Sequence, residues 1–195
     1  MDAPAAFYFD LASPTSYLAA ERALAVLPGP CPWQPILASR LPAAERYDAY
    51  RCETDELAAR DAIERRARAL GLQPLRWPAR FPFDSEPAML AATYARRIGK
   101  CVPFALAAFR QAFAGGNPLE AEDTIAIAGA ACEIHPRALL AALAQRGVRA
   151  ELERATAQAL ARGVGDVPAV RIGELVLAGE QQLEQAGELL AAARL

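Results

Sequence analysis

The sequence predicts an α/β protein in which a small sheet, built from both ends of the chain, is interrupted by a large helical insertion. Three observations lead to this fold class. Residues 1–40 show a strand, helix and strand pattern, residues 41–162 are dominated by helical periodicity, and residues 163–195 show a hairpin followed by a helix. With 195 residues, of which 54% are hydrophobic, the chain can bury a substantial core.

The first block reads as a βαβ unit. Residues 7–10 (Phe-Tyr-Phe-Asp) form a nearly continuous apolar run, as expected of a central strand. Apolar residues then recur at helical spacing from Tyr17 to Leu27, and Pro28-Gly29 ends that helix. Residues 32–37 are extended again. This unit is too short to form a domain alone.

The middle block carries several helical patterns. The clearest run from Thr54 to Leu70 and along an apolar stripe at 102–113, and further helices are predicted over 119–133, 137–145 and 150–162. The first of these helices has acidic and arginine side chains four residues apart, which predicts a solvated charged face. Those pairs are Glu56 with Arg60, Asp61 with Arg65, and Glu64 with Arg68.

The last block changes period. Residues 169–172 and 175–177, joined by a Gly173-Glu174 turn, predict a β-hairpin, and residues 180–193 predict a final helix. Neither end of the chain has enough elements to bury a sheet alone. The blocks together therefore predict a thioredoxin-like domain from residues 1–40 and 163–195, with an inserted all-helical domain at 41–162.

Composition excludes several classes of partner. The formal net charge is −2, which gives no electrostatic footprint for nucleic acid or anionic lipid. No apolar run approaches about 18 residues, and the start of the chain lacks the cationic and apolar segments of an export signal. We therefore expect a cytoplasmic protein without nucleic-acid or membrane partners.

The cysteines and the single histidine do not suggest a metal site. Cys31, Cys52, Cys101 and Cys132 lack Cys-x-x-Cys and zinc-like spacing, so we expect reduced, buried and inert thiols. His135 precedes Pro136 between two predicted helices, which favours a loop or cap residue over a general base. No metal site is expected.

The motif Ser13-Pro14-Thr15-Ser16 lies between the first strand and the first helix, where a thioredoxin-type redox protein would carry Cys-Pro-x-Cys. Hydroxyls cannot shuttle disulfide electrons, but they can donate hydrogen bonds to a thiolate. Ser13 before Pro14 is also a favoured helix N-cap, and one residue can serve in both ways. Ser16 is expected to pack or cap. Asp10 is expected to be a buried carboxylate, either near the site or structural.

Residues 7–18 closely resemble the opening of the DsbA-like branch that includes 2-hydroxychromene-2-carboxylate isomerases and kappa-class glutathione transferases. The resemblance extends over nearly the whole chain. The other segments that carry it are Trp33-Gln34-Pro35, Phe81-Pro82-Phe83-Asp84-Ser85, residues 163–168 and Gly173-Glu174-Leu175.

This resemblance implies a thiol site. Ser13 matches the catalytic serine that faces the sulfur of bound glutathione at a helix N-terminus, where free N–H groups and the helix dipole favour a thiolate over a thiol of pKa near 8.5. Val167 and Pro168 match the residues around a proline that is typically cis and clamps the cysteinyl portion. Without that role, Pro168 would merely start an edge strand.

Two segments depart from the family pattern. Glutathione-binding members usually carry Gly-Asn-Asp-Arg or Gly-Ser-Asp-Arg after the hairpin, where this chain has Gly179-Glu180-Gln181-Gln182. Glu180 and Gln181 are then the candidates to bind the ammonium and carboxylate of the cofactor, with altered charge. Asp166 stands where a glycine is usual. An acidic, arginine-paired helix also replaces a basic, proline-rich segment near residues 40–60.

The resemblance implies a glutathione-dependent or other thiol-dependent isomerase, which acts by adding a thiolate to a chromene carboxylate. Such an enzyme needs a cation for the substrate carboxylate and a flat apolar wall. Arg76 and Arg80, which flank Trp77, are the candidates for these tasks; the alternative is a surface arginine pair beside buried aromatics. A kappa-like transferase acting on another aromatic electrophile, and a catalytically silent binding module favoured by residues 180–182, remain open. A homodimer is expected.

Overall fold

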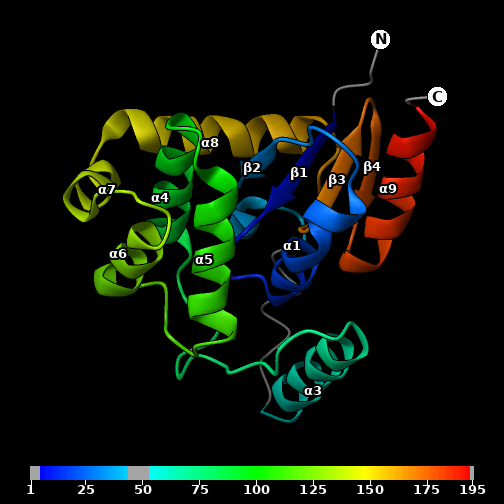
Figure 1. Ribbon diagram of the computed structural model, residues 1–195, viewed down its shortest axis with the longest axis horizontal. Helices are drawn as coiled ribbons and strands as arrows, with labels where there is room; N and C mark the ends of the chain where they lie inside the picture. The colour runs from blue at the N-terminus through cyan, green and yellow to red at the C-terminus, as the bar shows by residue number, and fades with distance from the viewer. Residues whose placement is uncertain (1–4, 44–52, 194–195) are drawn as a thin grey trace.

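The structure is a computed structural model that describes residues 5–43 and 53–193 (Figure 1). Strands and helices alternate at both ends of the chain, while the middle is helical. The elements are β1 (Ala5–Phe9), α1 (Pro14–Val26), β2 (Trp33–Pro35), the 3₁₀ turn η1 (Ala38–Arg40), α3 (Glu53–Ala69), α4 (Glu86–Arg97), α5 (Cys101–Phe113), α6 (Glu122–Ala130), α7 (Pro136–Leu143), α8 (Arg146–Ala161), β3 (Ala169–Ile172), β4 (Leu175–Ala178), the 3₁₀ turn η2 (Glu180–Gln182) and α9 (Leu183–Ala192).

The four strands form one mixed sheet in the order β2-β1-β3-β4. β1 pairs parallel with β2 and antiparallel with β3, and β3 pairs antiparallel with β4. In this register Phe7 lies between Trp33 and Val170. The βαβ unit and the hairpin predicted from the two chain ends are therefore confirmed, and they meet along β1 as a thioredoxin-like sheet.

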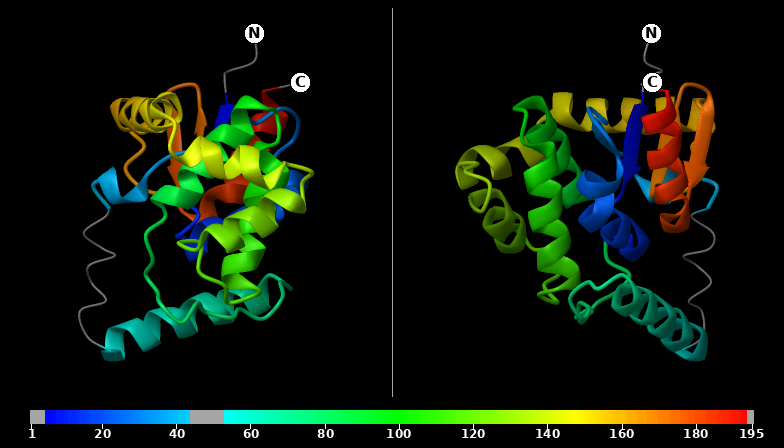
Figure 2. Two further views of the ribbon diagram at one scale, coloured as in Figure 1. Left: turned by 90° about the vertical axis from the view of Figure 1, so that its left-hand side faces the viewer. Right: turned by 45° about the vertical axis from the view of Figure 1, so that its right-hand side comes forward.

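Side chains alternate across the central strand, so both faces of the sheet are buried. Phe7 and Phe9 belong to the large core that includes residues of α1, α5 and α9, whereas Tyr8 packs in a smaller cluster with Ala159 of α8. Figures 1 and 2 show α8 crossing the sheet on the side opposite α1. The helices α4 to α7 lie beyond the β2 edge (Figure 1).

One continuous core joins the sheet to the helical segment. The rings of Phe9 and Phe109 are 5.9 Å apart, and those of Tyr17 and Phe113 are 5.6 Å apart. These contacts connect β1 and α1 directly to α5. The fold class predicted from the sequence, an α/β thioredoxin-like sheet with inserted helices, is thus observed, while the division into two domains stays a prediction.

Helix α4 is not among the helices that the sequence predicts. Seven of its residues are buried, and they lie on consecutive positions from Ala88 to Thr93 and at Ala95. The final helix also differs from expectation, because residues 180–182 form a 3₁₀ turn and α9 begins at Leu183.

Helix α3 meets the rest of the molecule near its end, where Ala67 is buried in the main core and the helix contacts α1. Figures 1 and 2 show it below the body of the molecule, on the side where α1 begins. Among the described residues no helix is both long and apolar enough to cross a membrane.

Candidate functional site

Asp10 organises the loop between β1 and α1. Only 1% of the residue is exposed, and its carboxylate accepts hydrogen bonds from the Ala12 N–H at 2.8 Å, the Ala38 N–H at 2.8 Å and the Ser85 hydroxyl at 3.0 Å. Burial nevertheless raises the pKa of the Asp10 carboxyl above its usual 3.8. The carboxylate therefore joins three segments of the chain. Of the two roles that the sequence allowed for Asp10, near the site or structural, these contacts fit the structural one.

Ser13 is the N-cap of α1, as predicted. Its Oγ accepts the Ser16 N–H at 3.1 Å and lies 3.0 Å from the Thr15 Oγ1, and the residue is 1% exposed. Capping uses only a lone pair of the hydroxyl oxygen, so the Ser13 hydroxyl keeps a proton that it can donate. The Ser16 hydroxyl is buried and has no hydrogen-bond partner among the described residues.

Val167 and Pro168 lie at the same end of the sheet as Ser13. Their peptide bond is cis, as the sequence predicted. Tyr8 pairs with Ala169, so the antiparallel register brings Pro168 beside the end of β1, from which the chain continues to Ser13. The Val167 N–H donates to the Asp166 Oδ1 at 2.8 Å. Asp166, absent from the usual family pattern, therefore occupies the backbone donor of Val167.

Glu180 is connected to this end of the sheet by its neighbour Gly179, whose N–H donates to the Pro168 carbonyl at 2.8 Å. The Glu180 side chain is 2% exposed. Its carboxylate accepts from Nε and Nη2 of Arg66 at 2.9 and 3.0 Å, and Arg22 of α1 donates to the same group. Two arginines therefore already bind the carboxylate that the sequence predicts as a ligand for an ammonium group.

Gln181 follows Glu180 in η2 and is exposed. Neither Arg22 nor Arg66 was identified from the sequence. Arg66 and Glu180 are 114 positions apart, so no local spacing relates them. The only available signal was the high arginine content of α3, which local pairs with nearby acids seemed to explain.

Trp77 is held by α3. Its Nε1–H donates to the Glu64 Oε1 at 2.8 Å, and the Arg60 guanidinium lies 5.0 Å from the centre of the Trp77 ring and 5.7 Å from that of Phe81. The Trp77 ring is 6.1 Å from Phe113, which in turn contacts Tyr17 of α1. The predicted apolar wall is therefore linked to the helix that Ser13 caps.

The two arginines beside Trp77 point to solvent. The Arg80 side chain is 83% exposed and lies 3.9 Å from the Glu120 carboxylate, and Arg76 is also exposed. Neither is brought to Ser13 by a contact within the described residues. Their placement agrees with the surface arginine pair that was the alternative to substrate binding.

Helix α3 contacts both Glu180 and Trp77. Arg66, near its end, binds Glu180, while Arg60 and Glu64 contact Trp77. The solvated face predicted for this helix holds for the exposed Asp61–Arg65 pair. The predicted Glu56–Arg60 pair is also formed. Arg60 and Glu64 contact Trp77 in addition, which the local pattern does not reveal.

The cysteine thiols are unsuited to redox chemistry. Cys31, Cys101 and Cys132 are free, and burial raises the pKa of Cys31 to about 11 and that of Cys101 to about 12. Cys52 lies outside the described residues. Within 5–43 and 53–193, no cluster of three or more His, Cys, Asp or Glu side chains is arranged to hold a metal ion. His135 is exposed at the start of α7.

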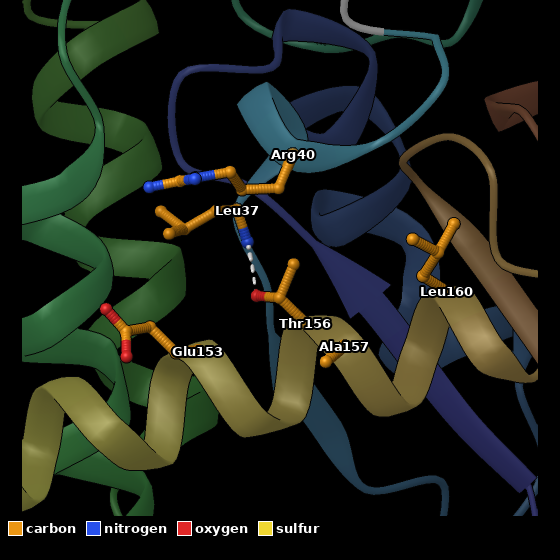
Figure 3. A pocket seen from close by; sticks show the side chains of 6 residues that line it. All are labelled: Leu37, Arg40, Glu153, Thr156, Ala157 and Leu160. Carbon is orange, nitrogen blue, oxygen red and sulfur yellow. Dashed lines mark hydrogen bonds between the residues drawn. The ribbon is translucent and has the colours of Figure 1, made fainter.

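A cavity of about 250 Å³ lies between η1 and α8, away from the Ser13 motif (Figure 3). In this view Arg40 and Glu153 lie toward one end and Leu160 toward the other. Two of the residues that line the cavity are hydrogen-bonded to each other: the Leu37 N–H donates to the Thr156 Oγ1 at 3.0 Å. None of the predicted site residues lines this cavity, so it is not part of the candidate site.

A thioredoxin-like sheet, helices inserted between β2 and β3, and a hydroxyl motif opposite a cis-proline define a thioredoxin-fold protein without the redox cysteine pair. The family model described as a DSBA-like thioredoxin domain matches residues 6–191, and the chain belongs to that family. A search of curated proteins gave no match.

Solved structures of the same fold include both isomerases and oxidoreductases. A 2-hydroxychromene-2-carboxylate isomerase superposes with a TM-score of 0.82 at 20% identity, covering 96% of this chain and 94% of that one. A probable DsbA oxidoreductase from Streptomyces coelicolor gives 0.78 at 18% identity, covering 97% and 89%. The cytosolic disulfide reductase DsbM from Pseudomonas aeruginosa, solved with GSH, gives 0.70 at 15% identity, covering 97% and 96%.

Proposed function

We propose that this protein is a glutathione-dependent, or other thiol-dependent, isomerase of the 2-hydroxychromene-2-carboxylate type. The observation that carries the proposal is the Ser13 hydroxyl, which caps α1 through a lone pair; its proton can be donated to a ligand when Thr15 is the donor in the bond between the two hydroxyls. The cis Val167-Pro168 pair at the same end of the sheet supports it. The similarity to a chromene-carboxylate isomerase and to a DsbM structure solved with GSH adds to this support.

Ser13 would supply the thiolate. The N-terminal N–H groups of α1 and its helix dipole favour negative charge beside the motif. The hydroxyl proton adds a charge-assisted hydrogen bond to the sulfur. Each unit by which the thiol pKa falls corresponds to about 1.4 kcal/mol of preferential thiolate binding, which one such donor can provide. At neutral pH the bound cofactor would then be largely ionised.

The thiolate is regenerated in the reaction and is not consumed. The thiolate adds to the conjugated carbon of the chromene, the adduct opens and rotates about what is now a single bond, and expulsion of the thiolate restores the double bond in the trans isomer. Trp77 would form the flat wall of this site. Arg76 and Arg80 would need to turn inward to meet the substrate carboxylate, because both are exposed.

Two assays separate the candidate functions. Calorimetry with glutathione tests cofactor binding, and ultraviolet assays with a chromene carboxylate and with chlorodinitrobenzene distinguish the isomerase from a kappa-like transferase. The silent binding module is favoured by one observation, the occupation of Glu180 by two arginines. Absence of glutathione binding, together with absence of turnover with other small thiols, would reject both enzymes.

The role of Ser13 is tested by Ser13→Ala. We expect the pKa of bound glutathione to rise, seen as a loss of thiolate absorbance at neutral pH. Ser39→Ala is the control, because Ser39 is an exposed serine of η1 outside the Ser13 motif. An unchanged thiolate titration in Ser13→Ala would reject the assigned role.

A further inference from the structure

The Ser13 hydroxyl has two partners in the first turn of α1. Its Oγ accepts the Ser16 N–H at 3.1 Å, and the Thr15 Oγ1 lies 3.0 Å from the same oxygen. A serine hydroxyl offers two lone pairs and one proton. The helix cap occupies one lone pair, so the bond with Thr15 uses either the second lone pair of Ser13 or its proton.

The direction of the Ser13–Thr15 hydrogen bond decides what Ser13 can offer a ligand. When Thr15 donates, both lone pairs of Ser13 are occupied and its proton is left for an acceptor outside the helix. When Ser13 donates, its proton is engaged and Ser13 presents only a lone pair, which repels an anion. A thiolate accepts hydrogen bonds and has no proton to give. Its binding at Ser13 therefore selects the arrangement in which Thr15 is the donor.

Thr15 can take the role of donor. Its side chain is half-buried, and its hydroxyl has no hydrogen-bond partner other than Ser13 among the described residues. The third hydroxyl of the motif, that of Ser16, is buried without a partner and so does not compete for Ser13. Hydrogen bonds in a chain polarise one another, so a bond donated to Ser13 strengthens the bond that Ser13 donates onward.

We propose that Thr15 is a positioning residue for the thiolate site: it donates its hydroxyl proton to Ser13 and thereby directs the Ser13 proton to the sulfur. This inference rests on the proposed function and adds a residue to its machinery. Thr15 acts through the Ser13 hydroxyl and does not itself bind the sulfur. No covalent bond is made or broken, because only the direction of two hydrogen bonds is fixed.

Titration of the bound thiol tests this role. Thr15→Val removes the hydroxyl and keeps the branched shape, and we expect the pKa of bound glutathione to rise by about 0.5 to 1, a threefold to tenfold loss in its ionisation constant. Thr15→Ser retains a donor and should restore the pKa measured with the unmodified chain. A merely structural role at the helix start would change thermal unfolding and leave the thiol titration where it was. An unchanged pKa in Thr15→Val, or a rise that Thr15→Ser does not reverse, would overturn the proposal.

A double-mutant cycle separates action through Ser13 from direct contact with the sulfur. Once Ser13→Ala has removed the first hydroxyl, Thr15→Val should raise the pKa of bound glutathione no further. Full additivity of the two substitutions would mean that Thr15 binds the sulfur itself, and would overturn the proposal. A rise in Ser13→Ala without one in Thr15→Val rejects this inference alone. Absence of glutathione binding to the unmodified chain, or an unchanged titration in Ser13→Ala, rejects the proposed role of Ser13 and the inference with it.

Discussion

At the scale of a single residue, burial and hydrogen bonding have opposite effects on the pKa of Asp10. Its carboxylate accepts three hydrogen bonds, yet complete burial still raises its pKa, so desolvation outweighs the bonds. Between 3.8 and the raised pKa, the folded protein holds a proton that the unfolded chain has released. The free energy of unfolding therefore falls as the pH rises through this interval.

Asp10→Asn tests this linkage. The amide cannot accept at both of the positions that bind N–H groups, so we expect a loss of about 1 to 3 kcal/mol in the free energy of unfolding at neutral pH. The variant should also lack the fall in stability that the unmodified chain shows as the pH rises from 3.8 through the raised pKa. Urea unfolding at a series of pH values measures both effects, and parallel pH profiles of the two proteins would contradict the assignment.

What the sequence can reveal about a site residue depends on where its partners are. The cap formed by Ser13 was predictable because its partner, Ser16, is three positions away. The partner of Asp10 at Ser85 is 75 positions away, and the partner of Glu180 at Arg66 is 114 positions away. Only the fold brings such groups together, so these ion pairs and hydrogen bonds could not be predicted from local sequence patterns.

At the scale of elements, the close approach of α9 to the end of α1 depends on a glycine. A Cβ atom added to Gly187 would overlap the backbone carbonyl oxygen of Val26 and lie 3.1 Å from its Cγ1. A backbone atom cannot move aside as a flexible side chain can. The glycine thus allows α9 to lie against α1, and this contact helps to place Glu180, which precedes α9.

Gly187→Ala should therefore destabilise the protein by about 1 to 3 kcal/mol, although alanine is the better helix former. Gly147→Ala is the matched control in α8, where the nearest atom is 3.6 Å away on the flexible Arg97 side chain. We expect that variant to keep or gain stability, by up to about 1 kcal/mol. Thermal unfolding followed by circular dichroism compares the two, and an equal response would contradict the packing account.

Elements with one exposed face were predictable, and fully covered ones were not. The stripe of α5 has the period of a helix, and the Gly173-Glu174 turn marks the β3–β4 hairpin. Helix α4 was not predicted; its residues from Ala88 to Thr93 are buried on consecutive positions. For α3 the sequence predicted the helix, but it could not predict which elements its charges contact.

At the scale of the whole molecule, a single core makes the sheet and the inserted helices depend on each other. Phe109 of α5 is fully buried, with its ring 5.9 Å from Phe9 and 6.2 Å from Tyr17. We expect Phe109→Ala to cost about 3 to 5 kcal/mol and to destabilise both parts equally. Trp33 fluorescence, measured in a Trp77→Phe background, reports on the sheet, and far-ultraviolet circular dichroism reports mainly on the helices.

The two signals should give coincident transitions in both the parent and the Phe109→Ala variant, as expected for two-state unfolding. Separate midpoints would show instead that the helical segment unfolds independently. That outcome would favour the division at residues 41–162 as a true domain boundary.

The strand order also has a consequence in time. β1 is an inner strand, but its antiparallel neighbour β3 begins only at Ala169. At a synthesis rate of roughly 5 to 20 residues per second, β1 waits on the order of ten seconds on the ribosome with one edge open. Throughout that interval the apolar residues 7–9 are available for pairing with other chains. The nascent segment therefore needs protection during synthesis, although in the folded protein both edges of β1 are paired.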